Sequence, residues 1–218
     1  MSSTFLNALA GTHLYPVTDR PLSLLSHAEQ VAQLSDGGAT LVQLREKLLS
    51  ALDFYNEAEV ALQVARERGV KIIINDRVDI ALALKADGVH LGQDDLPPAA
   101  ARRILGPDVI IGFSTHNPEQ AIVAATMPVD YLAIGPIFPT TTKQTSNPIV
   151  GIDGLRLVRQ AVGTVPIVAI GGITFENSGN VLSAGADAVA VIRGIWMPAG
   201  KATILTKRFL NKTELELY

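Results

Sequence analysis

Short apolar runs alternate with amphipathic segments along the whole chain. The apolar runs are rich in β-branched residues, and they predict strands at residues 13–18, 40–45, 70–75, 87–91, 109–113, 129–135, 165–171 and 187–193. Several of these runs are almost continuously apolar, which is typical of parallel strands that are covered on both faces. Helical patterns fill the gaps, so the chain alternates strictly between strand and helix.

The clearest predicted helix covers residues 50–69. Its apolar positions recur every three or four residues, as expected for a helix with one face on a core. The expected buried stripe consists of Leu52, Tyr55, Ala58, Leu62 and Ala65. Gly69 follows the stripe and is expected to end the helix, because glycine tolerates the left-handed conformation of a helix C-terminus.

Eight strands in strict alternation, without a long linker, favour an α/β fold with a single (β/α)8 TIM barrel. We expect residues 1–12 to form an N-terminal lead-in and residues 13–218 to form the barrel catalytic domain. A doubly wound open sheet is the alternative architecture. The number of strands favours the barrel, since open sheets of this kind commonly have five or six.

Composition narrows the function classes. The chain has 218 residues and a formal net charge of −3, which argues against a nucleic-acid partner. It has no cysteine, so disulfides, thiolate metal sites and cysteine nucleophiles are excluded. No apolar run reaches the roughly 18 residues of a membrane span, and the N-terminus lacks the features of a secretory signal. We therefore expect a cytoplasmic protein with no membrane partner; a homo-oligomer is compatible with the sequence.

In a (β/α)8 barrel, the active site lies at the C-terminal ends of the strands. Polar residues gather at these positions here, whereas the predicted strand bodies are apolar. They include "QLREK" after the second strand, "NDR" after the third, "GQDD" after the fourth and "STH" after the fifth. A purely structural barrel could also be polar at its rims, so loop polarity alone does not identify a site.

Two of these features go beyond rim polarity. Gly171 and Gly172 follow the seventh strand and "VIRG" follows the eighth, where barrels often bind phosphate through backbone N–H groups. Asp76 and Asp95 follow the third and fourth strands, near Lys47. Carboxylates without histidine or cysteine neighbours suit Mg²⁺, although each aspartate could instead cap the helix that follows it.

The remaining polar groups are less specific. His13, His27 and His90 are interpreted as structural histidines, whereas His116 and Ser114 are interpreted as binding groups rather than as a nucleophilic pair. The segment "GPIFPTTTKQTSNPIVG" at residues 135–151 is rich in hydroxyls. Such residues commonly serve local turn chemistry, so the composition of this segment does not by itself indicate a ligand.

Taken in order, five motifs resemble the thiamine-phosphate synthase family. They are "VQLREK", "INDRVDIALALKADGVHLGQDD", "IGFSTH", "YLAIGPIFPTTTK" and "PIVAIGGIT", and the match runs from about residue 13 to about residue 195. The resemblance implies a (β/α)8 barrel that uses one Mg²⁺ ion. It also implies two phosphorylated small-molecule substrates, a pyrimidine diphosphate and a thiazole phosphate, which are joined with release of pyrophosphate.

The resemblance also implies roles for individual residues. Arg45, Lys47 and Lys143 are expected to be catalytic, and Asp76 and Asp95 to bind the metal. The pyrimidine diphosphate is expected to contact Gln43, Leu44, Arg45, Glu46, Lys47, Asn75, Ser114 and Lys143. The thiazole phosphate is expected to contact Thr140, Thr141, Thr142, Gly172, Ile192 and Arg193.

One position departs from the family pattern. Arg193 stands after the eighth strand, where the resemblance leads us to expect a small hydroxyl residue. An arginine there could bind the thiazole phosphate or point away from it. The alternative functions are a thiazole tautomerase-like barrel, which would have little use for diphosphate and metal residues, and a non-catalytic phosphate-binding barrel.

Overall fold

A computed structural model describes residues 4–141 and 148–215, with the side chains of residues 212–215 left out. Its strands are β1 (Leu14–Pro16), β2 (Leu41–Leu44), β3 (Lys71–Asn75), β4 (Gly88–Leu91), β5 (Ile110–Thr115), β6 (Tyr131–Ile134), β7 (Ile167–Ile170) and β8 (Ala188–Val191). Its helices are α1 (Thr4–Leu9), α2 (Arg20–Ser23), α3 (His27–Asp36), α4 (Ala51–Glu67), α5 (Val78–Leu84), α6 (Pro98–Leu105), α7 (Pro118–Ala124), α8 (Gly151–Val162), α9 (Ser178–Ser183), α10 (Arg193–Trp196) and α11 (Ala202–Leu215).

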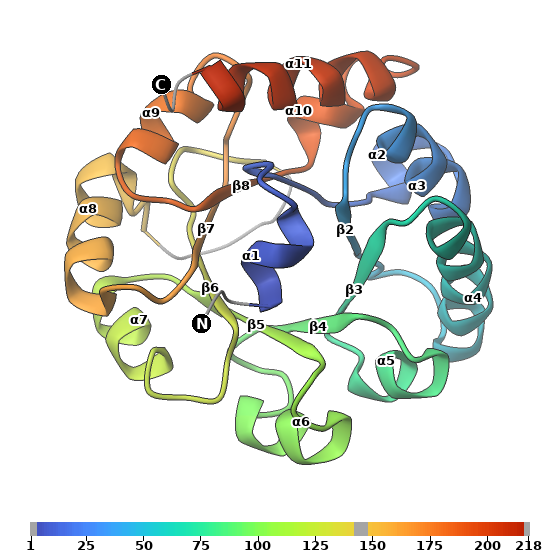
Figure 1. The fold of residues 1–218 in the computed structure, drawn as a ribbon, viewed down its shortest axis with the longest axis horizontal. Helices are drawn as coiled ribbons and strands as arrows, with labels where there is room; N and C mark the ends of the chain where they lie inside the picture. The colour runs from blue at the N-terminus through green and yellow to red at the C-terminus, as the bar shows by residue number, and fades with distance from the viewer. Residues whose placement is uncertain (1–3, 142–147, 216–218) are drawn as a thin grey trace.

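The eight strands form one parallel sheet in the order β1-β8-β7-β6-β5-β4-β3-β2. The sheet curls into a nearly closed barrel, and the helices other than α1 lie around it (Figure 1). A single bridge between Val17 and Gln43, with a hydrogen bond from the Thr18 N–H to the Gln43 carbonyl, joins β1 to β2. The predicted barrel is confirmed, and the strand order excludes a doubly wound sheet.

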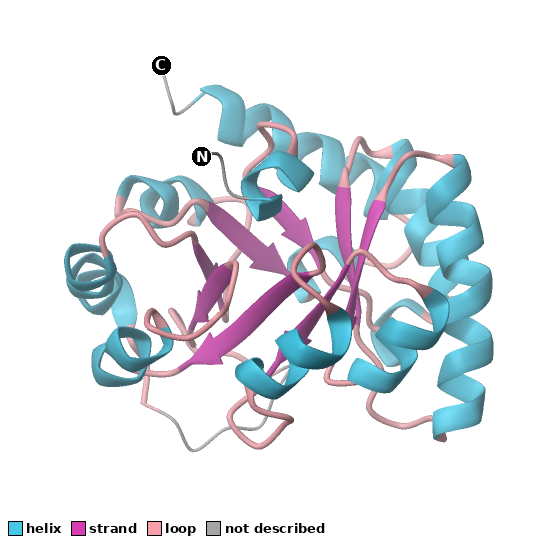
Figure 2. Ribbon diagram, turned by 60° about the horizontal axis from the view of Figure 1, so that its bottom comes forward, coloured by secondary structure: helices cyan, strands magenta, loops and turns pink. Residues whose placement is uncertain are grey.

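Helix α1 lies in the middle of the ring of strands in Figure 1. Phe5 is fully buried and stacks on Tyr131 with 4.1 Å between ring centroids. In Figure 2 the strand arrows point away from the end of the barrel that holds the N-terminus. Helix α1 therefore closes the N-terminal end of the barrel, and an active site is expected at the opposite end.

Helix α4 confirms the strongest helix prediction but corrects its buried face. Ser50 caps the helix by accepting the Asp53 N–H, and Gly69 follows the helix end with φ +69. Leu52, expected in the core, is 68% exposed. Ala58, Leu62 and Ala65 are buried as predicted, and Phe54 and Ala61 complete the buried face. Placing the large Phe54 ring in the core turns the helix by part of a turn from the predicted stripe.

Three aspartates link neighbouring strands by hydrogen bonds at the N-terminal end of the barrel. The side chains of Asp87, Asp130 and Asp187, just before β4, β6 and β8, accept a backbone N–H from β3, β5 and β7 at 2.9, 2.8 and 2.7 Å. Arg102 from α6 bonds Asp130 at 2.7 Å, and Arg159 from α8 bonds Asp187 at 2.8 Å. The same arrangement thus recurs along the chain in units of helix, strand, helix and strand.

Candidate active site

Side chains selected from the sequence gather at the C-terminal ends of the strands. Gln43 lies in β2, Asn75 ends β3 and Ser114 lies in β5. Arg45 and Lys47 follow β2, and the two aspartates follow β3 and β4. This placement agrees with the expectation that the loops at this end of the barrel build the site.

Two carboxylates and an ammonium group form the most highly charged part of this cluster. The Lys47 ammonium group hydrogen-bonds the Asp76 carboxylate. Burial raises the pKa of the Asp95 carboxyl, and the neighbouring charge of Asp76 raises it further, against the opposing effects of the Gly92 N–H and of Lys47. A cation bound by both carboxylates would relieve the repulsion between them.

Neither aspartate caps the helix that follows it. The residue before α5 is Arg77 and the residue before α6 is Pro97, and neither helix start has a side-chain cap. Asp76 has φ +64, an uncommon conformation for a residue with a side chain. Its N–H bonds the His90 carbonyl at 2.8 Å. Backbone strain of this kind is concentrated at functional sites, and here it fixes the direction of the carboxylate.

The buried side chain of Asn75 also points to a binding role for this part of the site. Its side chain is buried, and within the described residues the amide nitrogen has no hydrogen-bond partner. Leaving a buried donor unpaired costs about 1–3 kcal/mol, so a ligand atom is the expected partner. Arg45 lies nearby on the β2 loop, where its guanidinium is 3.4 Å from the Asp19 carboxylate.

Leu44 and Glu46 do not present their side chains to this cluster. Leu44 is fully buried in the outer core, between the strands and the helices. The Glu46 carboxylate accepts the N–H groups of Lys47 and Leu48, both at 2.7 Å, and lies 3.5 Å from the buried imidazole of His27. Glu46 therefore holds the shape of the β2 loop, and any ligand contact from these two residues would involve their backbone.

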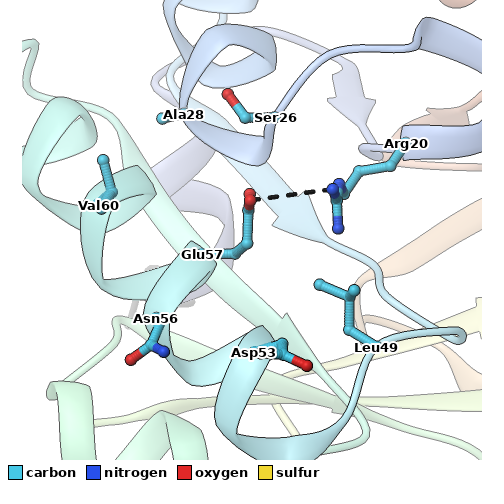
Figure 3. Close-up of a pocket in the computed structure, with 8 residues that line it drawn as sticks. All are labelled: Arg20, Ser26, Ala28, Leu49, Asp53, Asn56, Glu57 and Val60. Carbon is cyan, nitrogen blue, oxygen red and sulfur yellow. Dashed lines mark ion pairs between the residues drawn. The ribbon is translucent and has the colours of Figure 1, made fainter.

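A hollow lies beside this loop rather than over the charged cluster. It has a volume of about 490 Å³ and opens between helix α4 and the segment from α2 to α3. Figure 3 shows Arg20 and Glu57 facing each other across it, with 3.9 Å between their charged groups. Arg20 also lies 3.6 Å from the Glu46 carboxylate. Because the unpartnered amide of Asn75 and the carboxylates of Asp76 and Asp95 lie at the strand ends, we place the site there and not in this hollow.

The barrel interior contains polar residues that the sequence did not single out. Tyr15 and Tyr131 are buried, and their hydroxyls lie 3.0 Å apart. The Gln43 amide nitrogen donates to the Tyr15 hydroxyl at 3.1 Å. On the other side, the His90 ring is 2.9 Å from the Tyr131 hydroxyl and 2.8 Å from the Ser114 hydroxyl. His90, interpreted as structural, therefore contacts the predicted binding residue Ser114 and is linked to Gln43 through the two tyrosines.

The side of the site near β7 and β8 has the features of an anion-binding turn. Gly172 has φ +63, and a methyl group added there would lie 2.5 Å from the Pro139 carbonyl oxygen. Ile192 immediately precedes the short helix α10, and Arg193 is its exposed first residue. Backbone N–H groups at such a turn and helix start can bind a phosphate.

The loop after β6 is described only in part. Thr140 is half-buried and Thr141 is exposed, whereas Thr142 and Lys143 lie outside the described residues. His116 bonds the Gly135 carbonyl at 2.8 Å, at the point where this loop leaves β6. This contact gives His116 a role in holding the loop entry.

Across residues 4–141 and 148–215, the structure brings together no group of three or more histidine, cysteine or acidic side chains that could hold a metal ion. In the same part of the chain, no helix combines the length and the apolar character that a bilayer crossing requires. The site offers cations, a carboxylate pair and backbone donors. This set suits the binding of phosphorylated molecules and the stabilisation of a departing anion.

Comparisons with known proteins agree with this geometry. The family model described as thiamine monophosphate synthase matches residues 14–195. The chain is 49% identical over 183 residues to the thiamine-phosphate synthase of Chloroflexus aurantiacus, a match that covers 84% of each chain. It is 48% identical over 183 residues to the thiamine-phosphate synthase of Clostridium novyi, covering 84% of this chain and 89% of that protein.

A solved structure extends the likeness to almost the whole chain. The thiamine phosphate pyrophosphorylase from Pyrococcus furiosus is 36% identical and superposes with a TM-score of 0.87, covering 98% of this chain and 100% of that chain. The superposition includes the barrel and the ends of its strands.

Proposed function

The chain belongs to the thiamine monophosphate synthase family, which makes it a transferase of thiamine biosynthesis, and we propose the reaction and the residue roles that follow. It joins 4-amino-2-methyl-5-(diphosphooxymethyl)pyrimidine to 4-methyl-5-(2-phosphoethyl)thiazole or its 2-carboxy form. The products are thiamine phosphate and pyrophosphate. One observation carries the assignment of roles, namely the Lys47–Asp76–Asp95 cluster beside the unpartnered amide of Asn75.

The site is suited to a dissociative substitution. In the first step the bond between the pyrimidinylmethyl carbon and the diphosphate oxygen breaks, and the diphosphate keeps the electron pair. The remaining cation is stabilised by resonance with the aminopyrimidine ring, and the thiazole nitrogen then donates its electron pair to the methylene carbon. No strong nucleophile or general base from the protein is needed. The protein instead stabilises the leaving anion, a task for cations that are already in position.

In this scheme Arg45 and Lys47 bind the diphosphate, and Lys143 is assigned the same role from the sequence. Asn75 donates its unpartnered N–H to a diphosphate oxygen, which would satisfy the buried amide. Lys47 can exchange part of its bond with Asp76 for a substrate oxygen, because half of its side chain is exposed. Gln43 and Ser114 contact the pyrimidine ring.

Asp76 and Asp95 fit a single Mg²⁺ ion. Their oxygen-only donor set and the raised pKa of Asp95 are the properties expected of a carboxylate pair that holds a divalent cation together with phosphate oxygens. When bound, Mg²⁺ would supply positive charge to the departing diphosphate. Lys47 would neutralise Asp76 in its absence.

The thiazole phosphate is assigned to the opposite side of the site. The N–H groups of Gly172, Ile192 and Arg193 bind its oxygens, together with Thr140, Thr141 and Thr142. The exposed position of Arg193 leaves its backbone N–H as its contribution in the described conformation. The thiazole phosphate and the pyrimidine diphosphate would then bind on different sides of the strand ends.

The experiment is to mix both substrates with Mg²⁺ and follow pyrophosphate and thiamine phosphate together. We expect equal amounts of both products, and complete loss of both when EDTA removes the metal. Products that form undiminished in EDTA would remove the metal assignment. Isomerisation of the thiazole without pyrophosphate would support the tautomerase alternative, and phosphate binding without turnover would support a non-catalytic barrel.

A matched pair of lysine variants tests the residue roles. Lys47→Met should lower kcat/KM about 100-fold, because a cation that faces the leaving diphosphate is lost. Lys71→Met removes another lysine that is paired with an aspartate, at 2.7 Å from Asp87, but at the start of β3. We expect Lys71→Met to leave kcat/KM within about twofold, since exposed ion pairs contribute little. Equal effects of the two substitutions would contradict the assignment.

A further inference from the structure

Five polar side chains form one continuous chain through the barrel interior. It starts at Gln43 on β2, passes through Tyr15 on β1, Tyr131 on β6 and His90 on β4, and ends at Ser114 on β5. The donor–acceptor distances along it lie between 2.8 and 3.1 Å. Each of these five residues comes from a different strand. Both ends of the chain were assigned independently to the pyrimidine ring.

The number of protons on the inner members limits the direction of this chain. Burial raises the pKa of both Tyr15 and Tyr131, so each phenol keeps its one proton at neutral pH. Gln43 donates to the Tyr15 oxygen. The Tyr15–Tyr131 and Tyr131–His90 distances fit a donor on either side, and in the order that gives every phenol proton an acceptor Tyr15 donates to Tyr131 and Tyr131 donates to Nδ1 of His90. A phenol has a single proton, so in this order each bond uses the proton of the residue before it.

The same reasoning sets the state of the imidazole and of the serine. Since Nδ1 of His90 accepts a hydrogen bond, its Nε2 carries the proton and donates to the Ser114 oxygen at 2.8 Å. Ser114 then has its hydroxyl proton left to give to another acceptor. At the opposite end, Gln43 has used one N–H and keeps its carbonyl oxygen as an acceptor.

We propose that Tyr15, Tyr131 and His90 are positioning residues that couple Gln43 to Ser114, so that a ligand meets a fixed acceptor at Gln43 and a fixed donor at Ser114. This inference rests on the proposed function, in which both end residues contact the pyrimidine ring. An aminopyrimidine carries an amino donor and ring-nitrogen acceptors, so it matches this order of groups. A ring with the donor and acceptor exchanged would force the whole chain to reverse. The chain therefore selects for the aminopyrimidine rather than for its hydroxylated analogues.

The direct test is nitrogen NMR of the His90 ring in the full-length protein at pH 7.5, with His90→Asn used to assign its signals. We expect a neutral ring with protonated Nε2 and unprotonated Nδ1. A ring protonated at Nδ1, or at both nitrogens, would overturn the proposal. This measurement needs no turnover, so it stands even where the coupling assay shows no pyrophosphate release and the proposed function fails.

A kinetic test uses Tyr131→Phe, which removes the central hydroxyl and keeps the ring that stacks on Phe5. We expect the KM for the pyrimidine diphosphate to rise about tenfold, the scale of one buried hydrogen bond, and the KM for the thiazole phosphate to stay within about twofold. Ser114→Ala should also raise the pyrimidine KM, but it should add little in the Tyr131→Phe background. Unchanged pyrimidine KM in Tyr131→Phe, or fully multiplicative effects, would contradict the coupling.

Thr206→Val is the matched control. Thr206 is fully buried on α11, and its hydroxyl has no partner within the described residues. Removing it deletes a buried hydroxyl of similar size outside the chain of hydrogen bonds. We expect both KM values to stay within about twofold of the unsubstituted protein. A pyrimidine KM that rises equally in Thr206→Val would mean that the Tyr131 effect is a general response to core substitution, and would refute the proposal.

Discussion

Replacing Gly172 by alanine should damage both stability and thiazole-phosphate binding, and the structure provides a control at Gly69, which follows the end of α4. Both glycines have a positive φ, +63 at Gly172 and +69 at Gly69. They differ in their surroundings. A methyl group on Gly172 would meet the Pro139 oxygen at 2.5 Å and the Phe138 Cβ at 2.7 Å, whereas nothing lies within 4 Å of the same position at Gly69.

The magnitudes follow from this difference. The left-handed backbone alone costs an alanine about 1–2 kcal/mol, and this term is common to both variants. Overpacking against the β6 loop should add about 1–3 kcal/mol at Gly172 alone. For a chain of this size each kcal/mol lowers Tm by about 2–4 °C. Gly172→Ala should therefore lower Tm by clearly more than Gly69→Ala.

Thermal melting and steady-state kinetics provide the measurement. We expect Gly172→Ala to raise the KM for the thiazole phosphate about tenfold or more, because a misplaced turn shifts the N–H that faces the phosphate. The KM for the pyrimidine diphosphate should change little, and Gly69→Ala should leave both KM values unchanged. Equal loss of Tm in the two variants, with equal KM values, would refute the reasoning.

Three further predictions concern buried groups. Asn75→Leu removes an unpartnered amide, so Tm should stay the same or rise by about 1–3 °C while kcat/KM falls about 100-fold; a large fall in Tm would show that the amide has a structural partner. Asp95→Asn should raise Tm at pH 7.5, because the raised pKa of Asp95 means that its charge opposes folding above that pKa, and the gain should vanish below pH 3.8, where the carboxyl is protonated in both the folded and the unfolded state. Burial lowers the pKa of His27 below 6.5, so below that pH the unfolded chain binds a proton that the native state does not, and stability should fall as the pH falls; denaturant titrations of His27→Asn should show a shallower fall.

The architecture could be predicted because its signal is local. Parallel strands covered on both faces are continuous apolar runs, and the runs centred on "IIIN" and "IVAI" appear as β3 and β7. The burial of one helix face was harder to predict, as Leu52 shows. Its period is correct, but Phe54 outweighs it in apolar area, and the choice between neighbouring stripes depends on what the helix packs against.

Much of the site could be located for the same reason, since the residues after each strand meet at one end of a barrel. The inner chain of hydrogen bonds could not be found in this way. Tyr15 and Tyr131 are 116 positions apart in sequence, and His90 reads as one polar residue in a short strand. Glu46 shows a different limit. Its motif lies at the end of β2 as expected, but its carboxylate accepts N–H groups of the β2 loop. Side-chain direction beyond a strand end depends on tertiary contacts that no spacing encodes.

The hydrogen bonds from the aspartates before β4, β6 and β8 to the preceding strands divide the barrel into exchangeable modules. Each module runs from a helix to the end of an even-numbered strand, so its joints fall in the loops after β2, β4 and β6. Those joints contain Lys47, Asp95 and Thr140, respectively. Loops at joints can lengthen or change sequence without separating an aspartate from the strand that it holds. The loops after β2, β4 and β6 are therefore the segments that evolution, or an engineer, can alter with the least disturbance to these aspartate contacts.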